Sequence, residues 1–213
     1  MGSAYRSCML TAVVFVLSAT SLAFCQSLSG LKVGDDLSTT TSLNADPNDT
    51  TNMGPFSVNK WTLPDGNSLS VTAKVKNQKI VFIECDWNGS DSGTFSDFPD
   101  FYFGRTSLNE IRRQLRSNGF TFKDIGGVRA TDDGGLALLN SYSIEDNPSA
   151  IVTFVTKIDS CNLRALRDTK FEDSKVGEAA KLNAIIIADP SYLGTIWGSN
   201  RTYDPRYMDI TWK

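Results

Sequence analysis

The sequence of 213 residues contains no histidine, and this absence excludes more chemistry than any other property of its composition. Serine and cysteine nucleophiles of the triad type need an imidazole base, and histidine-containing zinc sites need an imidazole ligand. Positive charge is also scarce, because 21 Lys and Arg against 24 Asp and Glu give a net charge of −3. Non-specific binding to nucleic acid needs a basic surface, so we expect no nucleic-acid partner.

Long hydrophobic runs are missing as well, apart from a short one at the N-terminus. Residues 9–17 (MLTAVVFVL) are apolar, Arg6 precedes them, and small residues stand at the cleavage positions around Ala23. This arrangement is typical of a secretory signal peptide, which we place at residues 1–25. A membrane anchor needs ~20 apolar residues. We therefore expect a periplasmic or secreted protein with no membrane span after removal of the signal.

Cysteine is rare, and its positions limit which disulfides, lipid anchors and thiolate sites are possible. Of four cysteines, Cys8 leaves with the signal peptide, and Cys25 leaves too if cleavage falls before Gln26. Cys85 and Cys161 remain, and in an oxidising compartment they predict one disulfide, with two free thiols as the alternative. Lipidation of Cys25 stays open, because residues 22–25 have the length of a lipobox but place a bulky phenylalanine beside the cysteine. The absence of C-x-x-C spacing leaves a redox or zinc role without support.

An internal repeat organises the rest of the chain. Residues 61–76 (WTLPDGNSLSVTAKVK) align without a gap with residues 142–157 (YSIEDNPSAIVTFVTK). Each segment has turn residues between alternating apolar positions, which predicts a β-hairpin. Residues 79–87 and 181–189 predict a third strand in each copy, and a helical insertion is expected near residues 162–175. The match is modest, and unrelated hairpins also align in this way by chance.

Each copy also has a predicted helix start. Ser107 is suited to cap a helix, with Glu110 at capping-box distance, and the Asn-Gly pair at 118–119 is a stop signal. One apolar stripe follows the cap, formed by Leu108, Ile111 and Leu115. In the first copy, residues 35–36 (Asp-Asp) suit a helix start, although the threonine-rich segment after them forms helix poorly. The polar residues 44–52 predict a loop.

Two short motifs resemble a known family. Residues 30–34 (GLKVG) before a helix start, and residues 61–66 (WTLPDG) before an alternating strand, resemble the SmpA/OmlA small outer-membrane lipoproteins. The tandem arrangement resembles the beta-lactamase-inhibitor-protein-like (BLIP-like) fold. The resemblance implies an α+β fold of two related halves, each with short helices packed on an antiparallel sheet. It also implies an extracytoplasmic protein-binding module rather than an enzyme, and it carries over no individual binding residue.

These observations divide the chain into four parts. We expect a signal peptide at residues 1–25 and a first α+β repeat at 26–94. An aromatic linker follows at 95–103. The second α+β repeat, with the helical insertion and a C-terminal extension, covers 104–213.

Two patterns near residue 90 offer alternatives with their own chemistry. Residues 89–93 (GSDSG) differ from a serine-nucleophile motif, because Asp91 holds the centre. Oxygen-bearing side chains at positions 86, 88, 90, 92 and 97 have the spacing of a calcium-binding loop. Asp91 stands where that loop needs glycine, so weak calcium binding between Asp86 and Asp97 is left open and we predict no metal site.

Carboxylates and arginines elsewhere supply further alternatives. The pairs Asp132–Asp133 and Asp97–Asp100 offer paired carboxylates, as a small hydrolase uses them, but Asp-Gly runs are more often turns. Three arginines lie off the apolar stripe of the predicted helix. A solvated helix face is the ordinary explanation for them, and a site for an anionic partner is the alternative. They are Arg112, Arg113 and Arg116.

The densest unusual feature is the segment 95–103 (FSDFPDFYF), which holds five aromatic side chains in nine residues. Buried, these rings would join the two copies; exposed, they would form a binding hot spot. We predict burial of Phe101 and Phe103, which share one face of an extended segment, and exposure of Tyr102. The candidate partner contacts are Tyr102, Phe98 and Trp197. The aromatic residues after 190 predict strand and loop structure.

The sequence thus predicts an exported, non-enzymatic protein-binding module of the cell envelope or extracellular space. We expect no cofactor and no catalytic residue. The alternatives are a small carboxylate-based hydrolase and a purely structural envelope protein. We expect the partner to be another protein or an envelope component. Its identity and the oligomeric state stay open.

Overall fold

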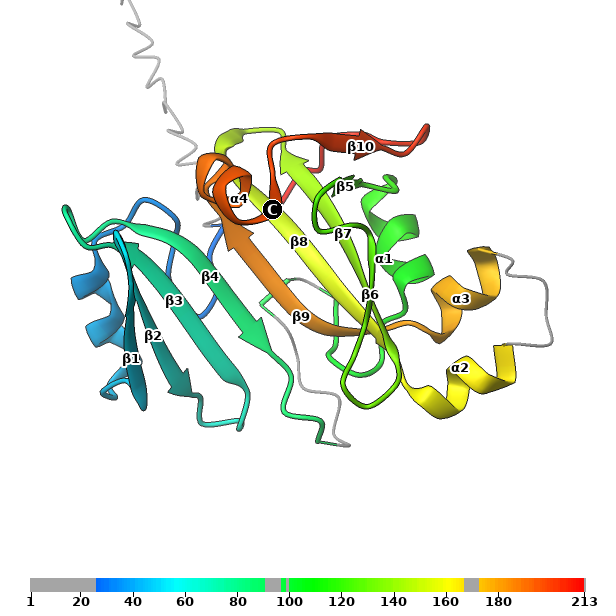
Figure 1. Ribbon diagram of the computed structural model, residues 1–213, viewed down its shortest axis with the longest axis horizontal. Helices are drawn as coiled ribbons and strands as arrows, with labels where there is room; N and C mark the ends of the chain where they lie inside the picture. The colour runs from blue at the N-terminus through cyan, green and yellow to red at the C-terminus, as the bar shows by residue number, and fades with distance from the viewer. Residues whose placement is uncertain (1–25, 91–96, 99, 167–172, 213) are drawn as a thin grey trace, which may run out of the picture.

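A computed structural model describes residues 26–90, 97–98, 100–166 and 173–212. The predicted signal peptide, the lipidation question at Cys25 and Phe95 of the aromatic segment lie outside these residues. The described chain forms one antiparallel sheet with short helices packed on it (Figure 1). The α+β class predicted from the sequence is confirmed.

The sheet has ten strands in the order β1-β2-β3-β4-β9-β8-β7-β5-β10, with β6 paired to β7 beside this path. Strands β4 and β9 meet at its centre, with Glu84 opposite Ile186. The predicted third strands are therefore neighbours in a single sheet. The strands are β1 (Asp49–Met53), β2 (Phe56–Thr62), β3 (Ser68–Lys74), β4 (Ile80–Asp86), β5 (Phe120–Phe122), β6 (Val128–Ala130), β7 (Leu136–Ile144), β8 (Asn147–Ile158), β9 (Lys181–Ala188) and β10 (Arg201–Tyr203).

The helices are short, and side-chain caps mark several of their starts. They are the 3-10 helix η1 (Leu37–Leu43), α1 (Leu108–Leu115), α2 (Ser160–Leu166), α3 (Asp173–Ala179) and α4 (Pro190–Trp197). The predicted starts are confirmed, because Asp36 accepts a hydrogen bond from the Ser38 N–H and Ser107 Oγ accepts one from the Glu110 N–H. The threonine-rich segment forms a 3-10 helix rather than an α-helix. Helices α2 and α3 occupy the predicted insertion between β8 and β9.

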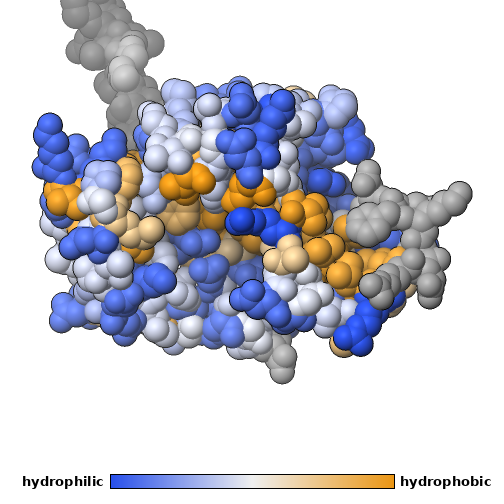
Figure 2. Space-filling view, in the orientation of Figure 1, coloured by the Kyte–Doolittle hydropathy of each residue, from blue (hydrophilic) through white to orange (hydrophobic). Residues whose placement is uncertain are grey.

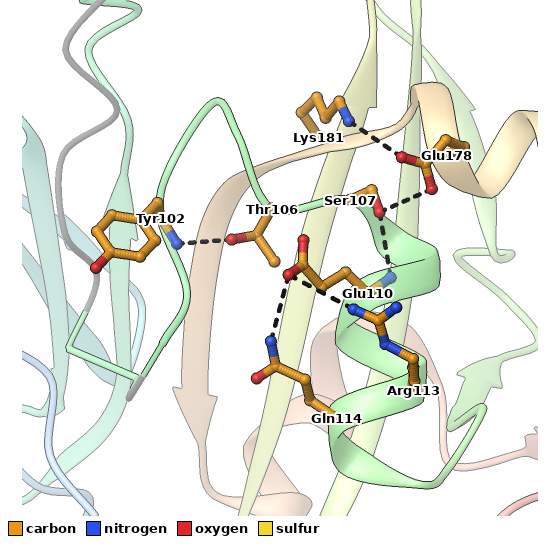
Figure 3. Close-up of polar contacts among 8 residues, drawn as sticks. All are labelled: Tyr102, Thr106, Ser107, Glu110, Arg113, Gln114, Glu178 and Lys181. Carbon is orange, nitrogen blue, oxygen red and sulfur yellow. Dashed lines mark hydrogen bonds and ion pairs between the residues drawn. The ribbon is translucent and has the colours of Figure 1, made fainter.

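Figure 3 shows how the start of α1 is held. Ser107 Oγ donates to the Glu178 carboxylate at 3.3 Å, and Glu178 lies 3.9 Å from the Lys181 ammonium. The Glu110 carboxylate turns to Arg113 and Gln114 on its own helix. The helix ends earlier than predicted, because Arg116 adopts a left-handed conformation, with φ 54°, two residues before Asn118.

The two faces of the sheet carry separate apolar cores. We call them the α1 face and the α4 face, after the helices that pack on them. The main core, on the α1 face, joins β3, β4, β8 and β9 to Ile111 of α1 and to the N-terminal residues Leu28 and Leu31. The core on the α4 face gathers Phe82 and Ile186 around Leu193 of α4. Both halves of the chain contribute to the main core, so they fold as one body.

The described phenylalanines of the aromatic segment pack into the main core, in the predicted alternation. Phe101 and Phe103 are buried, whereas 40% of Tyr102 is exposed. Phe98 stacks on Phe101 with ring centroids 4.8 Å apart, and the Phe101 ring meets the edge of Phe154 of β8. Phe98 is itself buried, which removes it from the candidate partner contacts.

Two predictions of local structure are wrong. The polar residues 44–52 predict a loop, but β1 begins at Asp49 and pairs with β2 through the Gly54-Pro55 turn. Its residues are all exposed, so the cross-strand hydrogen bonds, and not burial, form it. The aromatic tail was expected as strand and loop, but α4 runs from Pro190 to Trp197. Asp189 caps this helix by accepting from the Tyr192 N–H.

The predicted disulfide is also corrected, because Cys85 and Cys161 are both free thiols. Cys85 belongs to β4 and points into the main core, whereas Cys161 is exposed in α2. Burial raises the pKa of the Cys85 thiol to about 12, with nearby carboxylates adding to the effect. The thiolate is the reactive form, so Cys85 is chemically inert in the folded protein.

This difference predicts the outcome of thiol labelling. In the folded protein a maleimide is expected to label Cys161 and to leave Cys85 unmodified, because only Cys161 is accessible. After denaturation without reductant, both should label. Mass spectrometry of the labelled peptides distinguishes the two positions, and failure of both to label before reduction would show that they are bonded after all.

Candidate functional site

A pair of carboxylates occupies the centre of the sheet. Because side chains alternate along a strand, Glu84 and Asp86 of β4 both point to the α4 face. Glu84 lies opposite Ser70 of β3 and Ile186 of β9. Lys60 of β2 is opposite Ser70, and so completes a row across the sheet. Both carboxylates are half-buried.

The surroundings make this pair an acid–base candidate. Burial and, to a smaller extent, the Asp86 carboxylate raise the pKa of Glu84, the Lys60 ammonium opposes them, and the net value is about 8. Burial also raises the pKa of Asp86, again with Lys60 opposing. Two carboxylates that share one site do not readily ionise together, so one of them holds a proton near neutral pH. A protonated and an ionised carboxyl side by side can serve as general acid and base.

The carboxylate pairs proposed from the sequence have structural roles instead. Asp133 forms an ion pair of 2.8 Å with Lys157 and accepts from the Gly135 N–H in the turn before β7. Asp97 accepts from the Ser29 N–H, and Asp100 is an exposed turn residue with φ 64°. The signal that identifies Glu84 was available in the sequence. Residues 79–87 (KIVFIECDW) place two acids on one face of an otherwise apolar strand.

The side chains that have the spacing of a calcium-binding loop make local hydrogen bonds instead. The Asn88 amide donates to the Asp65 carbonyl, and its oxygen accepts from the Ser90 N–H. Asp97 is engaged with the Ser29 N–H. Position 92 lies outside the described residues. Over the part of the chain that the structure describes, no cluster of three or more Cys, Asp or Glu side chains offers a metal site.

An apolar surface extends from the edge of the sheet to α4. Met53 of β1 lies opposite Phe56 of β2. The Phe56 ring meets the edge of the Tyr192 ring at 4.8 Å, and Ile196 follows Tyr192 by one helical turn. Met53 is 63% exposed and Ile196 45% exposed. We call this set the β1–α4 surface. Figure 2 shows apolar side chains running in a band across this view of the molecule, with polar residues above and below.

A hollow of about 720 Å³ lies at the end of the sheet where β9 begins. Trp87, Lys157 and Lys181 line it. Asp133 neutralises Lys157, and Glu178 lies beside Lys181, so neither ammonium is available as an unpaired charge. The site therefore lacks the convergent charge that would assign it a ligand.

The remaining predicted residues are dispersed. Tyr102 lies at the turn before α1, where its N–H donates to Thr106 Oγ1 and its ring points away from the α1 cap (Figure 3). Trp197 packs at the far end of α4 against Phe122, so it does not join Tyr102 in one surface. Arg113 and Arg116 are exposed, as a solvated helix face predicts. Arg112 is half-buried and differs from them.

Comparison with known proteins adds little. No protein-family model matches the sequence, and no curated protein matches it either. A cysteine-rich secretory protein from Staphylococcus aureus superposes with a TM-score of 0.46 and 12% identity, over 86% of this chain and 51% of that one. An extracellular SCP-domain protein from Bacillus anthracis gives 0.42 and 7%, over 81% and 49%. This chain spans about half the length of each, and similarities this low carry no functional argument.

The length and polarity of the helices decide whether any of them could span a membrane. Among the described residues, every helix is too short or too polar to cross a bilayer.

Proposed function

We propose that the chain is an exported, non-enzymatic protein-binding module of the cell envelope or extracellular space. The β1–α4 surface carries the proposal. Met53 lies opposite Phe56 and Ile196 lies one helical turn after Tyr192, so two exposed apolar side chains flank the contact between the Phe56 and Tyr192 rings. Exposed apolar patches with aromatic residues are typical of protein-interaction sites. Export rests on the signal-peptide pattern.

The edge of this surface indicates the chemistry of the partner. Lys74 is opposite Phe56, and the Val75 N–H donates to the Pro55 carbonyl, which brings the β3–β4 turn beside the β1–β2 turn. Val75 is exposed and lies between Lys74 and Lys76. We therefore expect a partner protein with an apolar centre and an acidic rim, because opposite charges favour encounter and fix orientation.

The proposal includes an origin by duplication, in line with the SmpA/OmlA-like and BLIP-like resemblance. The strand order β2-β3-β4-β9-β8-β7 supports it, since two three-stranded units meet at β4 and β9. The gapless alignment needs revision, however. Residues 63–67 connect β2 to β3, whereas residues 145–146 connect β7 to β8. Trp61 pairs with Leu69 but Tyr142 pairs with Val152, so the aligned second strands are offset by two residues.

A pull-down with matched variants tests the binding proposal. The double change Met53→Asp and Ile196→Asp places two charges in the β1–α4 surface and should reduce recovery of a specific envelope protein at least about tenfold, as loss of a hot spot does. Met208→Asp changes an equally exposed apolar residue elsewhere and should leave recovery unchanged. Equal recovery with all three proteins, or no specific protein with the wild type, would favour a purely structural role.

The Glu84–Asp86 pair favours a second candidate, a small carboxylate-based hydrolase. This candidate predicts turnover of an envelope glycan or ester by the wild type and its loss in Glu84→Gln. Glu145→Gln, which changes an exposed glutamate, is the matched control. Absence of turnover by the purified wild type across such substrates would eliminate the hydrolase.

A further inference from the structure

A small polar pocket lies between the end of α1, strand β5 and strand β10. Its volume is about 300 Å³, at the lower end of the range for small-molecule sites. Side chains more than 80 residues apart in the sequence meet there. The polar lining comes from Arg112, Asn118, Thr121, Asn140, Thr202 and Asp204.

The pocket contains buried donors that the protein satisfies only incompletely. Arg112 Nε and Asn118 Nδ2 are both buried without a hydrogen bond of normal geometry, and only 8% of Asn118 is exposed. Arg112 interacts with the Tyr142 hydroxyl beneath the lining at Gly119, and Asn118 interacts with the Asp204 carboxylate. A buried donor whose hydrogen bond is long or poorly aligned destabilises the folded state. Two such donors at one place leave room for an outside acceptor to improve on these contacts.

The backbone around Asn118 is firmly held. The Asn140 amide donates to the Asn118 carbonyl at 2.9 Å. Ser117 Oγ donates to the Met208 carbonyl and accepts from the Met208 N–H, which ties this turn to the C-terminal tail. Gly119 has φ 75°, and a Cβ there would lie 2.7 Å from the Ser141 carbonyl oxygen. The glycine therefore lets the turn sit directly on β7, so the Asn118 amide is fixed before any ligand arrives.

The two charged side chains of the pocket lining, Asp204 and Arg112, differ in how closely they are paired with an opposite charge. Asp204 accepts from the Arg206 N–H at 2.8 Å and lies 3.8 Å from the Arg206 guanidinium. In the described part of the chain, no carboxylate lies within ion-pair distance of Arg112. Asp204 interacts with Arg112 only from beyond ion-pair distance, and its own close pairing is with Arg206. The aromatic side chains of Phe120 and Tyr203 form the apolar part of the lining.

We propose that this pocket binds a small carboxylate, held by the Arg112 guanidinium and the Asn118 amide, with its apolar body against Phe120 and Tyr203. Guanidinium groups match carboxylates geometrically and form strong, charge-assisted hydrogen bonds with them. The ligand is either a free organic acid or the terminal carboxylate of a peptide. The site is separate from the β1–α4 surface, so it stands or falls independently of the proposed protein binding.

Titration of the full mature chain, followed by amide NMR, tests the site. With sodium benzoate at constant ionic strength, the Asn118 side-chain amide and the Gly119 N–H are expected to shift and saturate. Arg112→Gln should weaken binding about tenfold or more, because it removes the charge and the fork of donors. Arg113→Gln removes the neighbouring exposed charge and should leave binding unchanged. Thr202→Glu places a negative charge on the exposed part of the lining and should weaken binding without disturbing the core.

A second experiment distinguishes a free organic acid from the terminal carboxylate of a peptide as the ligand. A short peptide with a free C-terminus is compared with its amidated form as a competitor of benzoate. Competition by the free form alone assigns the site to a chain terminus, and no competition by either assigns it to a free acid. Absence of saturable shifts with benzoate and with the free peptide would overturn the proposal, as would equal binding by wild type, Arg112→Gln and Thr202→Glu. Saturation by inorganic phosphate alone would overturn the carboxylate assignment.

Discussion

Phe101→Ala is expected to lower the free energy of unfolding by about 3–5 kcal/mol, the usual cost of removing a buried phenylalanine. The Phe101 side chain is completely buried. Its ring stacks on Phe98 and packs against Phe154 of β8, so its loss leaves a cavity between the aromatic segment and the sheet. Chemical denaturation, with the midpoint and slope both fitted, measures the change.

Tyr102→Ala is the matched control for that variant. Its ring is 40% exposed, and the contact of its N–H with Thr106 Oγ1 survives the substitution. The expected cost is about 1 kcal/mol or less. Equal destabilisation by the two variants would remove the alternation argument, and no effect of either would show that the segment does not hold the core together.

The sequence predicted the sheet well where residues alternate. Both hairpins follow from apolar residues at every second position, and the buried ring of Phe101 follows from the same period. Strands β4 and β9 follow instead from nearly continuous apolar runs, which are typical of strands buried on both faces. The cap of α1 was equally visible, because Ser107 stands one residue before an apolar helical stripe. These features depend on residues close in sequence, so local patterns are sufficient to find them.

Predictions failed where a local preference was weak or was misread. Strand β1 is polar and fully exposed, and it forms because the Gly54-Pro55 turn presents it to β2. Helix α4 was mistaken for strand because its aromatic residues dominate the pattern. The Asp189-Pro190 pair, a side-chain cap followed by proline in the first turn, was the correct signal.

The candidate sites were less predictable than the fold. Alternation alone places Glu84 and Asp86 on one face, but their perturbed chemistry comes from burial against neighbouring strands. The pocket around Arg112 and Asn118 depends on β10 and Asp204, which follow about 90 residues later. No sequence period connects such positions, and only the paired strands β5 and β10 bring them together.

Glu84→Gln is expected to make the protein more stable at alkaline pH, the second large effect. The pKa of Glu84 is about 8 in the folded protein against a usual value of 4.5. Between these values the folded state keeps a proton that the unfolded state releases, so stability falls as pH rises from about 4.5 to about 8. At 1.36 kcal/mol for each pH unit, and with Asp86 and Lys60 sharing the effect, the loss is about 3–5 kcal/mol. Glutamine stays neutral at every pH, so the variant does not lose this stability.

Denaturant unfolding of wild type and variant between pH 4 and pH 9 makes the measurement. The two proteins should be about equally stable at pH 4 and diverge as pH rises, with the variant ahead at pH 9. Carboxylates with a lowered pKa, such as Asp36 and Asp133, lose their stabilising effect only as pH falls through those lowered values, below the Glu84 window. The buried Cys85 thiol, with its pKa raised from 9.0 to about 12, lowers stability only above the range tested.

Glu145→Gln should track the wild type at every pH. A wild-type stability that stays level or increases from pH 5 to pH 8 would mean that Glu84 ionises freely, and the acid–base pair would then be lost together with the hydrolase candidate.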